Sequence, residues 1–312
     1  MQKQGKTIGI IAAASSAILL GLTPILGKIS LQLGFSPLFI VTFRSILATV
    51  LVFLFLFIFN RSFLRIYSLG LIGCILAGAV NGLGSILFYS ALSLLDASIG
   101  QLLYSFYPLM VAFWLLLDRQ TLPRLTIVRL SISIFGAVLL IGASAKGVSI
   151  QGAVMMLGAA ALYGLHLIIN QKVLYEAPTP TVTFYTLLSM AVTVSIFYLV
   201  FDRKIPPSTA NLQPVIILGV ITALSRVLLF LGVKKIGGME TALLGLGELL
   251  VTVLAAQIFL GETLTGIQWF GAGLLLLSLI LVGFDRLPPQ KRRLKGLLSW
   301  LTPTEVKPTD LQ

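Results

Sequence analysis

Long apolar runs alternate along this chain with short connections that carry many of its prolines and charged residues. About 20 consecutive apolar residues are enough for a helix to cross a hydrocarbon core about 30 Å thick. No connection is long or polar enough to form a soluble domain. The pattern predicts ten membrane-spanning helices, near residues 7–29, 37–59, 68–93, 97–117, 125–145, 149–170, 181–201, 213–233, 239–260 and 264–284.

The ten runs divide into two copies of a five-helix unit, because short words recur in order at nearly one spacing of 141–143 residues. The matching words are Val41–Arg44 with Val182–Tyr185, Leu20–Leu22 with Tyr163–Leu165, and Leu117–Leu122 with Leu260–Leu264. An odd number of spans per copy turns the second copy upside down relative to the first, as in many secondary transporters. We therefore expect an all-α membrane protein of ten transmembrane helices, arranged as two inverted five-helix repeats around a central cavity. The repeats cover residues 7–145 and 149–284, and a basic tail follows at 285–312.

Composition agrees with this class. Hydrophobic residues make up 57% of the chain and charged residues 10%, with a mean hydropathy of +1.03, whereas soluble domains carry about 25% charged residues. The net charge of +12 comes from Lys and Arg residues scattered among loops, which indicates membrane topology and not nucleic-acid binding. The single cysteine, Cys74, excludes a disulfide within the chain.

Loop charges predict the orientation, since cytoplasmic loops carry an excess of Lys and Arg. With both termini in the cytoplasm, the cytoplasmic side receives Lys3, Lys6, Arg61, Arg65, Arg119, Arg124, Lys172, Lys234, Lys235 and the basic tail. The other side receives only Lys28, Lys146, Arg203 and Lys204. The loop after the fourth span is basic, whereas its counterpart after the ninth carries Glu262, as inverted copies require. We expect a multi-pass protein of the inner or plasma membrane.

The tail allows two interpretations. Its basic cluster precedes Leu294, Leu297, Leu298 and Leu301, which share one helical face and could lie on anionic lipid. Alternatively, the tail is disordered and its charges serve only to fix topology.

A set of residues spread over both copies carries a resemblance to a known family. They are Gly21, Gly164, Arg44, Ala91-Leu92, Pro108 and the turn Leu260-Gly261-Glu262-Thr263-Leu264. Over residues 7–284 the chain resembles the drug/metabolite transporter superfamily, in its EamA-type branch. The resemblance implies inverted five-helix bundles, alternating access and transport of small metabolites, often outward. The chain departs from the family pattern at Asp118-Arg119-Gln120, where a Gly-Glu is usual, and at Glu248-Leu249, where Glu-Pro is common.

Four ionisable residues lie inside predicted spans: Arg44, His166, Arg226 and Glu248. Such residues are costly in a membrane, so they are expected to face the bundle interior or a wet cavity. Lys28 and Glu240 lie near helix ends, where a long side chain reaches the interface.

Arg226 and Glu248 have two interpretations. In the functional one, Glu248 binds a substrate ammonium group or a proton, and Arg226 is its partner or clamps a substrate carboxylate. In the structural one, the two form a buried ion pair that fixes helix packing. Gly245 and Gly247 precede Glu248 and allow a substrate or another backbone to approach.

Arg44 is expected to be structural, capping a neighbouring helix or binding a lipid phosphate; its counterpart in the second copy, Tyr185, is uncharged. His166 is the only histidine and could relay protons, since its unperturbed pKa lies near neutrality. A hydrogen-bonded packing role is the alternative. No second His or Cys stands at ligand spacing, so we expect no metal.

The fourth span supplies the clearest candidate cavity face. Gln101, Tyr104 and Pro108 repeat at helical spacing. Pro108 frees a backbone carbonyl, which a cavity tolerates better than lipid does, and Pro24 after Thr23 makes a similar break in the first span. The predicted substrate-binding residues are Gln101, Tyr104, Tyr107, Asn81, Tyr163, His166, Arg226 and Glu248, and the predicted structural residues are Arg44, Pro108 and Pro24. Such a lining suits amphipathic or zwitterionic solutes.

The leading function is a secondary transporter for amino-acid-like or other amphipathic metabolites, working as an exporter, with proton coupling left open. A flippase for a lipid-linked sugar, a polytopic enzyme and a channel are the alternatives. The enzyme is disfavoured because no catalytic set of side chains is visible, and direct ATP drive because no P-loop is visible. We expect no cofactor. The expected partners are a small-molecule solute and membrane lipid, and a homodimer is left open.

Overall fold

The computed structural model describes residues 2–117, 124–142, 149–203, 211–245, 247–263 and 265–281. The predicted tail at 285–312 and the Asp118-Arg119-Gln120 turn lie outside these residues. All regular structure in the described part is helical. The helices are α1 (Gln2–Gly21), α2 (Thr23–Gln32), α3 (Pro37–Phe59), η1 (Arg61–Leu64), α4 (Ser68–Leu94), α5 (Ala97–Tyr104), α6 (Tyr107–Leu117), α7 (Arg124–Gly142), α8 (Ile150–Leu174), α9 (Thr179–Phe201), α10 (Gln213–Ile236), α11 (Gly238–Gly245), α12 (Gly247–Leu260) and α13 (Gly266–Ile280).

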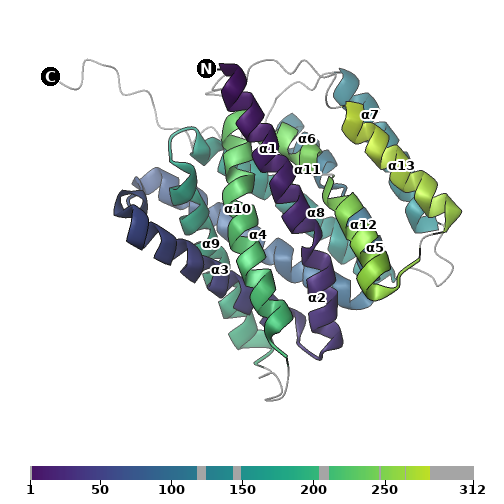
Figure 1. The fold of residues 1–312 in the computed structure, drawn as a ribbon, viewed down its shortest axis with the longest axis horizontal. Coiled ribbons are helices and arrows are strands. Elements are labelled where there is room, and N and C mark those ends of the chain that lie inside the picture. Colours follow the sequence, from purple (N-terminus) through teal and green to yellow (C-terminus); the bar gives the residue numbers. More distant parts are fainter. Residues whose placement is uncertain are drawn as a thin grey trace.

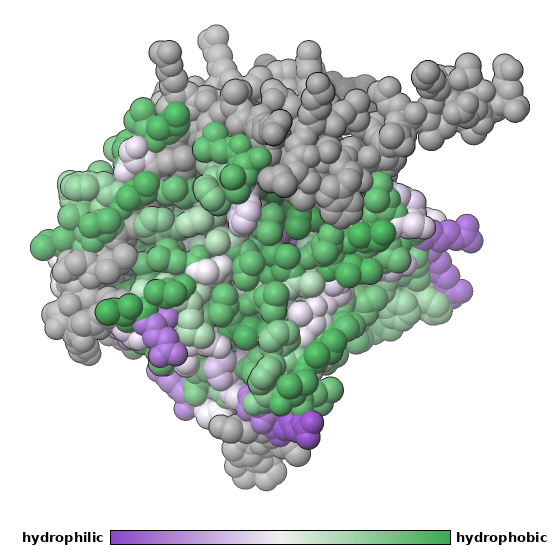
Figure 2. All heavy atoms as spheres, turned by 180° about the vertical axis from the view of Figure 1, so that it is seen from behind, coloured by the Kyte–Doolittle hydropathy of each residue, from purple (hydrophilic) through white to green (hydrophobic). Residues whose placement is uncertain are grey.

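Eight helical stretches in the described part are long and apolar enough to cross a membrane. The helices α7 and α13 lie at the positions of the other two predicted spans and pack side by side (Figure 1). The chain is therefore a multi-pass membrane protein, and the count of ten spans stays a prediction. Large apolar side chains such as Phe55, Ile58 and Phe201 are exposed. Figure 2 shows a broad apolar surface with hydrophilic residues toward its margins, which suits contact with lipid.

Two spans are interrupted at prolines. Helix α1 stops at Gly21 and α2 restarts beyond Leu22 with Pro24 in its first turn. Helix α5 stops at Tyr104, and α6 begins at Tyr107 with Pro108 in its first turn. Proline has no N–H to donate to the carbonyl four residues earlier, and its ring crowds that carbonyl. Both interruptions lie where the sequence predicted them.

Helices of the two copies pack against each other in matching pairs. Helix α1, from the first copy, packs along α10 of the second, and α8, which opens the second copy, packs along α4 of the first. Helix α3 likewise packs against its counterpart α9, and α7 against α13. Each contact thus has an equivalent when the two copies are exchanged. The core of the protein lies between the two copies.

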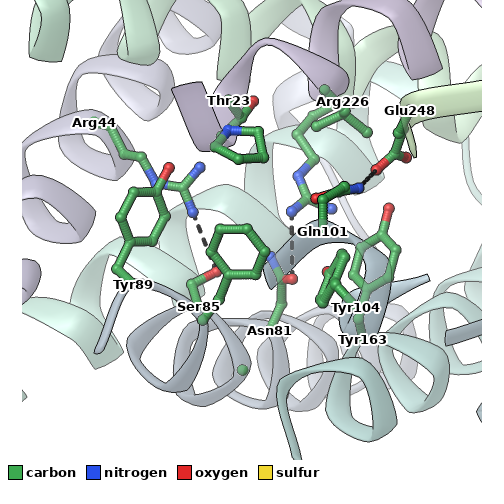
Figure 3. A pocket seen from close by; sticks show the side chains of 14 residues that line it. Thr23, Arg44, Asn81, Ser85, Tyr89, Gln101, Tyr104, Tyr163, Arg226 and Glu248 are labelled. Carbon is green, nitrogen blue, oxygen red and sulfur yellow. Dashed lines mark hydrogen bonds between the residues drawn. The ribbon is translucent and has the colours of Figure 1, made fainter. Parts of the chain in front are cut away.

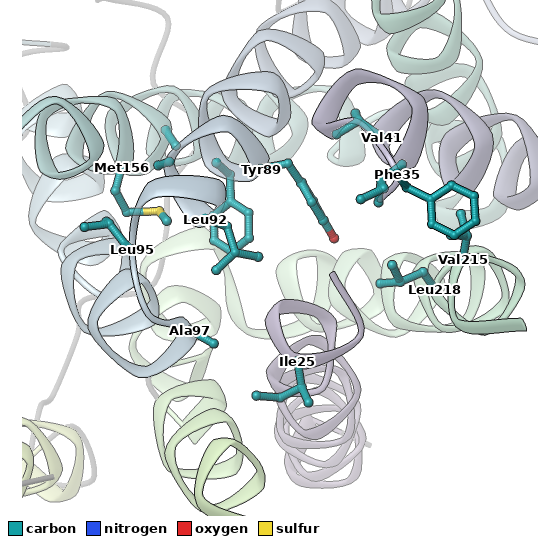
Figure 4. Packing of buried hydrophobic residues seen from close by; sticks show 14 of the residues in the cluster. Ile25, Phe35, Val41, Tyr89, Leu92, Leu95, Ala97, Met156, Val215 and Leu218 are labelled. Atoms are coloured by element: carbon teal, nitrogen blue, oxygen red, sulfur yellow. The ribbon is translucent and has the colours of Figure 1, made fainter. Parts of the chain in front are cut away.

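The largest apolar cluster near the bundle centre draws on both copies (Figure 4). Tyr89 and Leu92 from α4 share it with Met156 from α8 and with Val215 and Leu218 from α10. This packing fixes the rotation of α4 and α10 about their axes. It therefore determines which polar side chains of these helices face inward.

Candidate functional site

A cavity lies at the junction of the two copies (Figure 3). The space between its lining atoms is about 490 Å³, a volume that includes space open to solvent. Its lining residues are Leu20, Thr23, Pro24, Arg44, Asn81, Gly84, Ser85, Phe88, Tyr89, Gln101, Tyr104, Tyr163, Arg226 and Glu248. They come from α1, α2, α3, α4, α5, α8, α10 and α12. Among them only Arg44, Arg226 and Glu248 carry charge, and each is at most 5% exposed.

Arg44 on α3 reaches between two helices of different copies. Its guanidinium donates to the Ser85 hydroxyl on α4 at 3.2 Å and to the Thr222 hydroxyl on α10 at 3.4 Å. It also lies 4.8 Å from the centre of the Tyr89 ring, in a cation–π contact. These partners lie along helices and not at helix ends. Arg44 therefore lines the cavity. It does not cap a helix, which was one of the two structural roles expected from the sequence.

Arg226 on α10 makes a second bridge to α4, one helical turn away from the first. Its guanidinium donates to the Asn81 side-chain oxygen at 3.3 Å and lies 3.3 Å from Nε2 of His166. Thr222 and Arg226 are one turn apart on α10, as Asn81 and Ser85 are on α4. The two arginines thus form successive rungs between α4 and α10.

Glu248, near the start of α12, faces the cavity opposite Arg44. Its carboxylate accepts a hydrogen bond of 3.4 Å from the side-chain amide of Gln101 on α5 (Figure 3). Within the described residues, no ion pair joins Glu248 to Arg226, whose hydrogen-bond partners are Asn81 and His166. The buried ion pair considered from the sequence is therefore absent in this conformation, and both charges stand at the cavity wall.

Aromatic rings form the rest of the wall. The Tyr104 ring packs against Phe88, Tyr107 and Tyr163, with ring centres 4.9, 5.6 and 5.5 Å apart. Tyr104, Tyr163 and Phe88 line the cavity, whereas Tyr107 lies behind them, 2% exposed. The Tyr107 hydroxyl packs on Gly245, where any added Cβ would collide with it. Tyr107 therefore supports the wall.

His166 also lies behind the wall and is fully buried. Its Nδ1 lies 2.9 Å from the Ala77 carbonyl oxygen, and its Nε2 faces Arg226. These two contacts are both satisfied by a neutral ring that donates from Nδ1 and accepts at Nε2. The geometry favours the packing interpretation, in which His166 positions Arg226.

Six of the eight predicted substrate-binding residues line the cavity: Asn81, Gln101, Tyr104, Tyr163, Arg226 and Glu248. Tyr107 and His166 do not, and neither does Pro108, which was predicted to share the cavity face but is buried in the first turn of α6. Pro24 and Arg44, predicted as structural, do line it. Ser85 and Tyr89 were missed. With Asn81 they repeat every four residues on α4, a polar stripe that could have indicated them.

Two polar contacts fasten one end of the bundle near the cavity. Lys28 on α2 donates to the carbonyl oxygens of Leu92 and Leu95 at the end of α4, at 3.0 and 2.6 Å. Glu262 accepts from the backbone N–H groups of Ala97 and Ser98, which open α5, at 2.8 and 2.9 Å. Both pairings place charge where the helix dipole favours it. The first ties α2 to the end of α4, and the second ties the turn after α12 to the start of α5.

We predict that Glu262→Ala lowers the stability of the protein by about 1–2 kcal/mol, because two N–H groups of α5 lose their acceptor. Thermal unfolding in detergent measures the change. Asp96→Ala is the matched control, since Asp96 stands at the N-cap of α5 but makes no side-chain capping bond. Equal melting temperatures for the two variants would contradict the capping role of Glu262.

Comparison with known proteins gives three findings. Residues 7–142 and 150–284 each match the model of the EamA-like transporter family, which confirms the resemblance seen in the sequence. No curated protein matches the chain. A solved crystal structure aligns with 91% of this chain and 98% of its own, with a TM-score of 0.69 and 20% identity. That similarity supports a shared fold.

Proposed function

Because the chain belongs to the EamA-like transporter family, we propose that it is a secondary transporter for small metabolites that works by alternating access. The observation that carries the proposal is the cavity itself. Side chains of both copies line it, and its three charged residues lie within membrane spans. Ionisable residues at that depth are costly and generally mark a substrate or ion pathway.

The position of the cavity supports alternating access. It lies between helices of the two copies, near the interruption between α1 and α2, and α5 contributes Gln101 and Tyr104 just before the second interruption. Interrupted helices at a repeat interface are the usual place for a transported solute. The course of the two arginine rungs supports inverted copies, because residue numbers rise along α10 from Thr222 to Arg226 while they fall along α4 from Ser85 to Asn81. We infer that rocking of one copy against the other exposes the cavity to each side in turn.

The finer parts of the proposal rest on the sequence. The bias of Lys and Arg toward one set of loops supports both termini in the cytoplasm and a place in the inner or plasma membrane. Outward transport is proposed because members of the family that the sequence resembles often export metabolites. A homodimer is the oligomeric state to be tested by measuring the mass of the purified protein.

Transport by purified protein in proteoliposomes tests the function. The panel comprises amino acids, purines and sugars, each with and without an imposed pH gradient. Movement of one solute class above protein-free vesicles supports the proposal. Movement of labelled lipid without any solute would support the flippase instead.

Glu248 is the proposed coupling residue, since proton binding there changes the charge of the cavity by one unit. We predict that Glu248→Gln abolishes any acceleration of transport by a pH gradient, because the amide cannot ionise. Glu176→Gln serves as the matched control and should keep the pH response, because this exposed carboxylate lies outside the cavity. A Glu248→Gln variant with the wild-type pH response would remove the coupling role.

A further inference from the structure

Four polar atoms around the cavity have no hydrogen-bond partner within the described residues. They are Nε of Arg44, Nε of Arg226, the Thr23 hydroxyl and the Tyr89 hydroxyl. All four residues line the cavity, and none is more than 7% exposed. Buried polar atoms are normally hydrogen-bonded, so a group of four around one cavity calls for an explanation.

The four atoms share a chemical character, because each can donate a hydrogen bond. A guanidinium has five N–H donors and no acceptor, and a hydroxyl has one donor. Arg44 uses its guanidinium for Ser85 and Thr222, yet it has no carboxylate partner within the described residues. Four unpaired donors around one cavity fit a ligand group that only accepts hydrogen bonds.

The charges of the cavity point the same way. Two guanidinium groups face one carboxylate, which leaves a positive excess in a buried site. The arginine rungs lie one helical turn apart, a rise of about 5.4 Å, so both positive charges can act on one anionic group. Guanidinium and oxyanion also match in geometry, since the planar fork binds two oxygens at once.

The carboxylate lies away from the Arg44 side. In Figure 3, Arg44 and Tyr89 lie at one end of the cavity, and Glu248 lies at the other end, bonded to Gln101. An anion at the Arg44 end is therefore attracted by the arginines and kept apart from Glu248.

We propose that the solute carries an oxyanion, a carboxylate or a phosphate, which binds between Arg44, Thr23 and Tyr89, with Arg226 supplying the second positive charge. This inference rests on the proposed function, because it takes the cavity as the solute site. The aromatic wall of Phe88, Tyr104 and Tyr163 holds the remainder of the solute.

Three probes share a phenyl ring and differ in their charged group: 3-phenylpropanoate, phenyl phosphate and phenethylamine. Comparing them shows which charged group the site binds. Each is added to the full-length purified protein in detergent, and its binding is read from the rise in melting temperature and from equilibrium titration. We expect the carboxylate or the phosphate to stabilise the protein and the amine to have no effect. The better of the two anions identifies the source of the oxyanion.

Conservative variants test the residues. Tyr89→Phe and Thr23→Val each remove a hydroxyl that has no hydrogen-bond partner within the described residues. We expect each to weaken anion binding about tenfold while leaving the melting temperature without ligand unchanged or raised. Tyr185→Phe is the control. Its hydroxyl donates to the Leu64 carbonyl at 2.7 Å, away from the cavity, so this variant should lose stability and keep binding.

Three results would overturn the inference: binding of the amine as tight as that of the anions, no binding of any probe, or wild-type anion affinity in both Tyr89→Phe and Thr23→Val. The outcome is separable from that of the proposed function. Transport of a cationic solute would keep the transporter and overturn the oxyanion site. Anion binding without transport of any solute would keep the oxyanion site and overturn the proposed transport function.

Discussion

Replacing Arg226 by Gln is expected to reduce transport by roughly 100-fold, without unfolding the protein. Arg226 makes hydrogen bonds with Asn81 and His166 and supplies one of two positive charges in the cavity. Charge-assisted hydrogen bonds contribute about 1.5–3 kcal/mol each, and 2.7 kcal/mol corresponds to roughly 100-fold. The initial rate of solute movement in proteoliposomes, at equal protein content, measures the effect.

Two further variants separate a role in transport from a role in packing. Arg226→Lys keeps the positive charge but loses the two-pronged donor, and we expect it to recover part of the rate. Arg61→Gln removes an exposed arginine that lies outside the cavity and should transport normally. Wild-type transport by Arg226→Gln, with a normal melting temperature, would show that this arginine only fixes helix packing.

The second large effect is expected on stability, from Gly78→Ala on α4. At Gly78 a Cβ would lie 2.5 Å from the Thr186 backbone oxygen and 2.5 Å from Cβ of Ser189, both on α9. A backbone atom cannot move aside alone, so α4 and α9 must separate. We expect a loss of about 3 kcal/mol, at the upper end of typical overpacking costs. Thermal unfolding in detergent measures it.

Gly273→Ala provides the matched control for this substitution. Gly273 is exposed on α13, and an added Cβ there has no atom within 4 Å. This variant should melt at or above the wild-type temperature, because Ala favours a helix by up to about 1 kcal/mol over Gly. A Gly78→Ala protein as stable as Gly273→Ala would contradict the close packing of α4 on α9.

Much of the fold could be read from the sequence, because long apolar runs have few alternatives to membrane-spanning helices. The prolines also located the interruptions after Gly21 and Tyr104. The rotation of each helix about its axis was harder to predict. It follows from the packing between copies: the four-residue spacing of Asn81, Ser85 and Tyr89 is visible in the sequence, but that this stripe faces inward became clear only when α4 was seen against α10.

The site was predicted in part for a similar reason. Sequence reasoning identified the costly buried charges, and all three charged residues that line the cavity were among them. It could not supply the distances between helices. These distances decide whether two buried charged residues form an ion pair or have separate partners. Arg226 and Glu248 thus proved to have different partners. His166 shares α8 with the cavity residue Tyr163, and Tyr107 begins α6 just after the cavity residues of α5, but both side chains support the wall from behind.

Chemical labelling of Ser85→Cys is the most direct test of whether solute passes through this cavity. Ser85 lines the cavity, and the only native cysteine, Cys74, is fully buried, so the wild type serves as the control. We predict that a methanethiosulfonate reagent attached at position 85 blocks transport of the solute identified in proteoliposomes, that a reductant restores it, and that excess solute slows labelling. Normal transport by protein shown by mass spectrometry to be fully labelled at this position would contradict passage through the cavity.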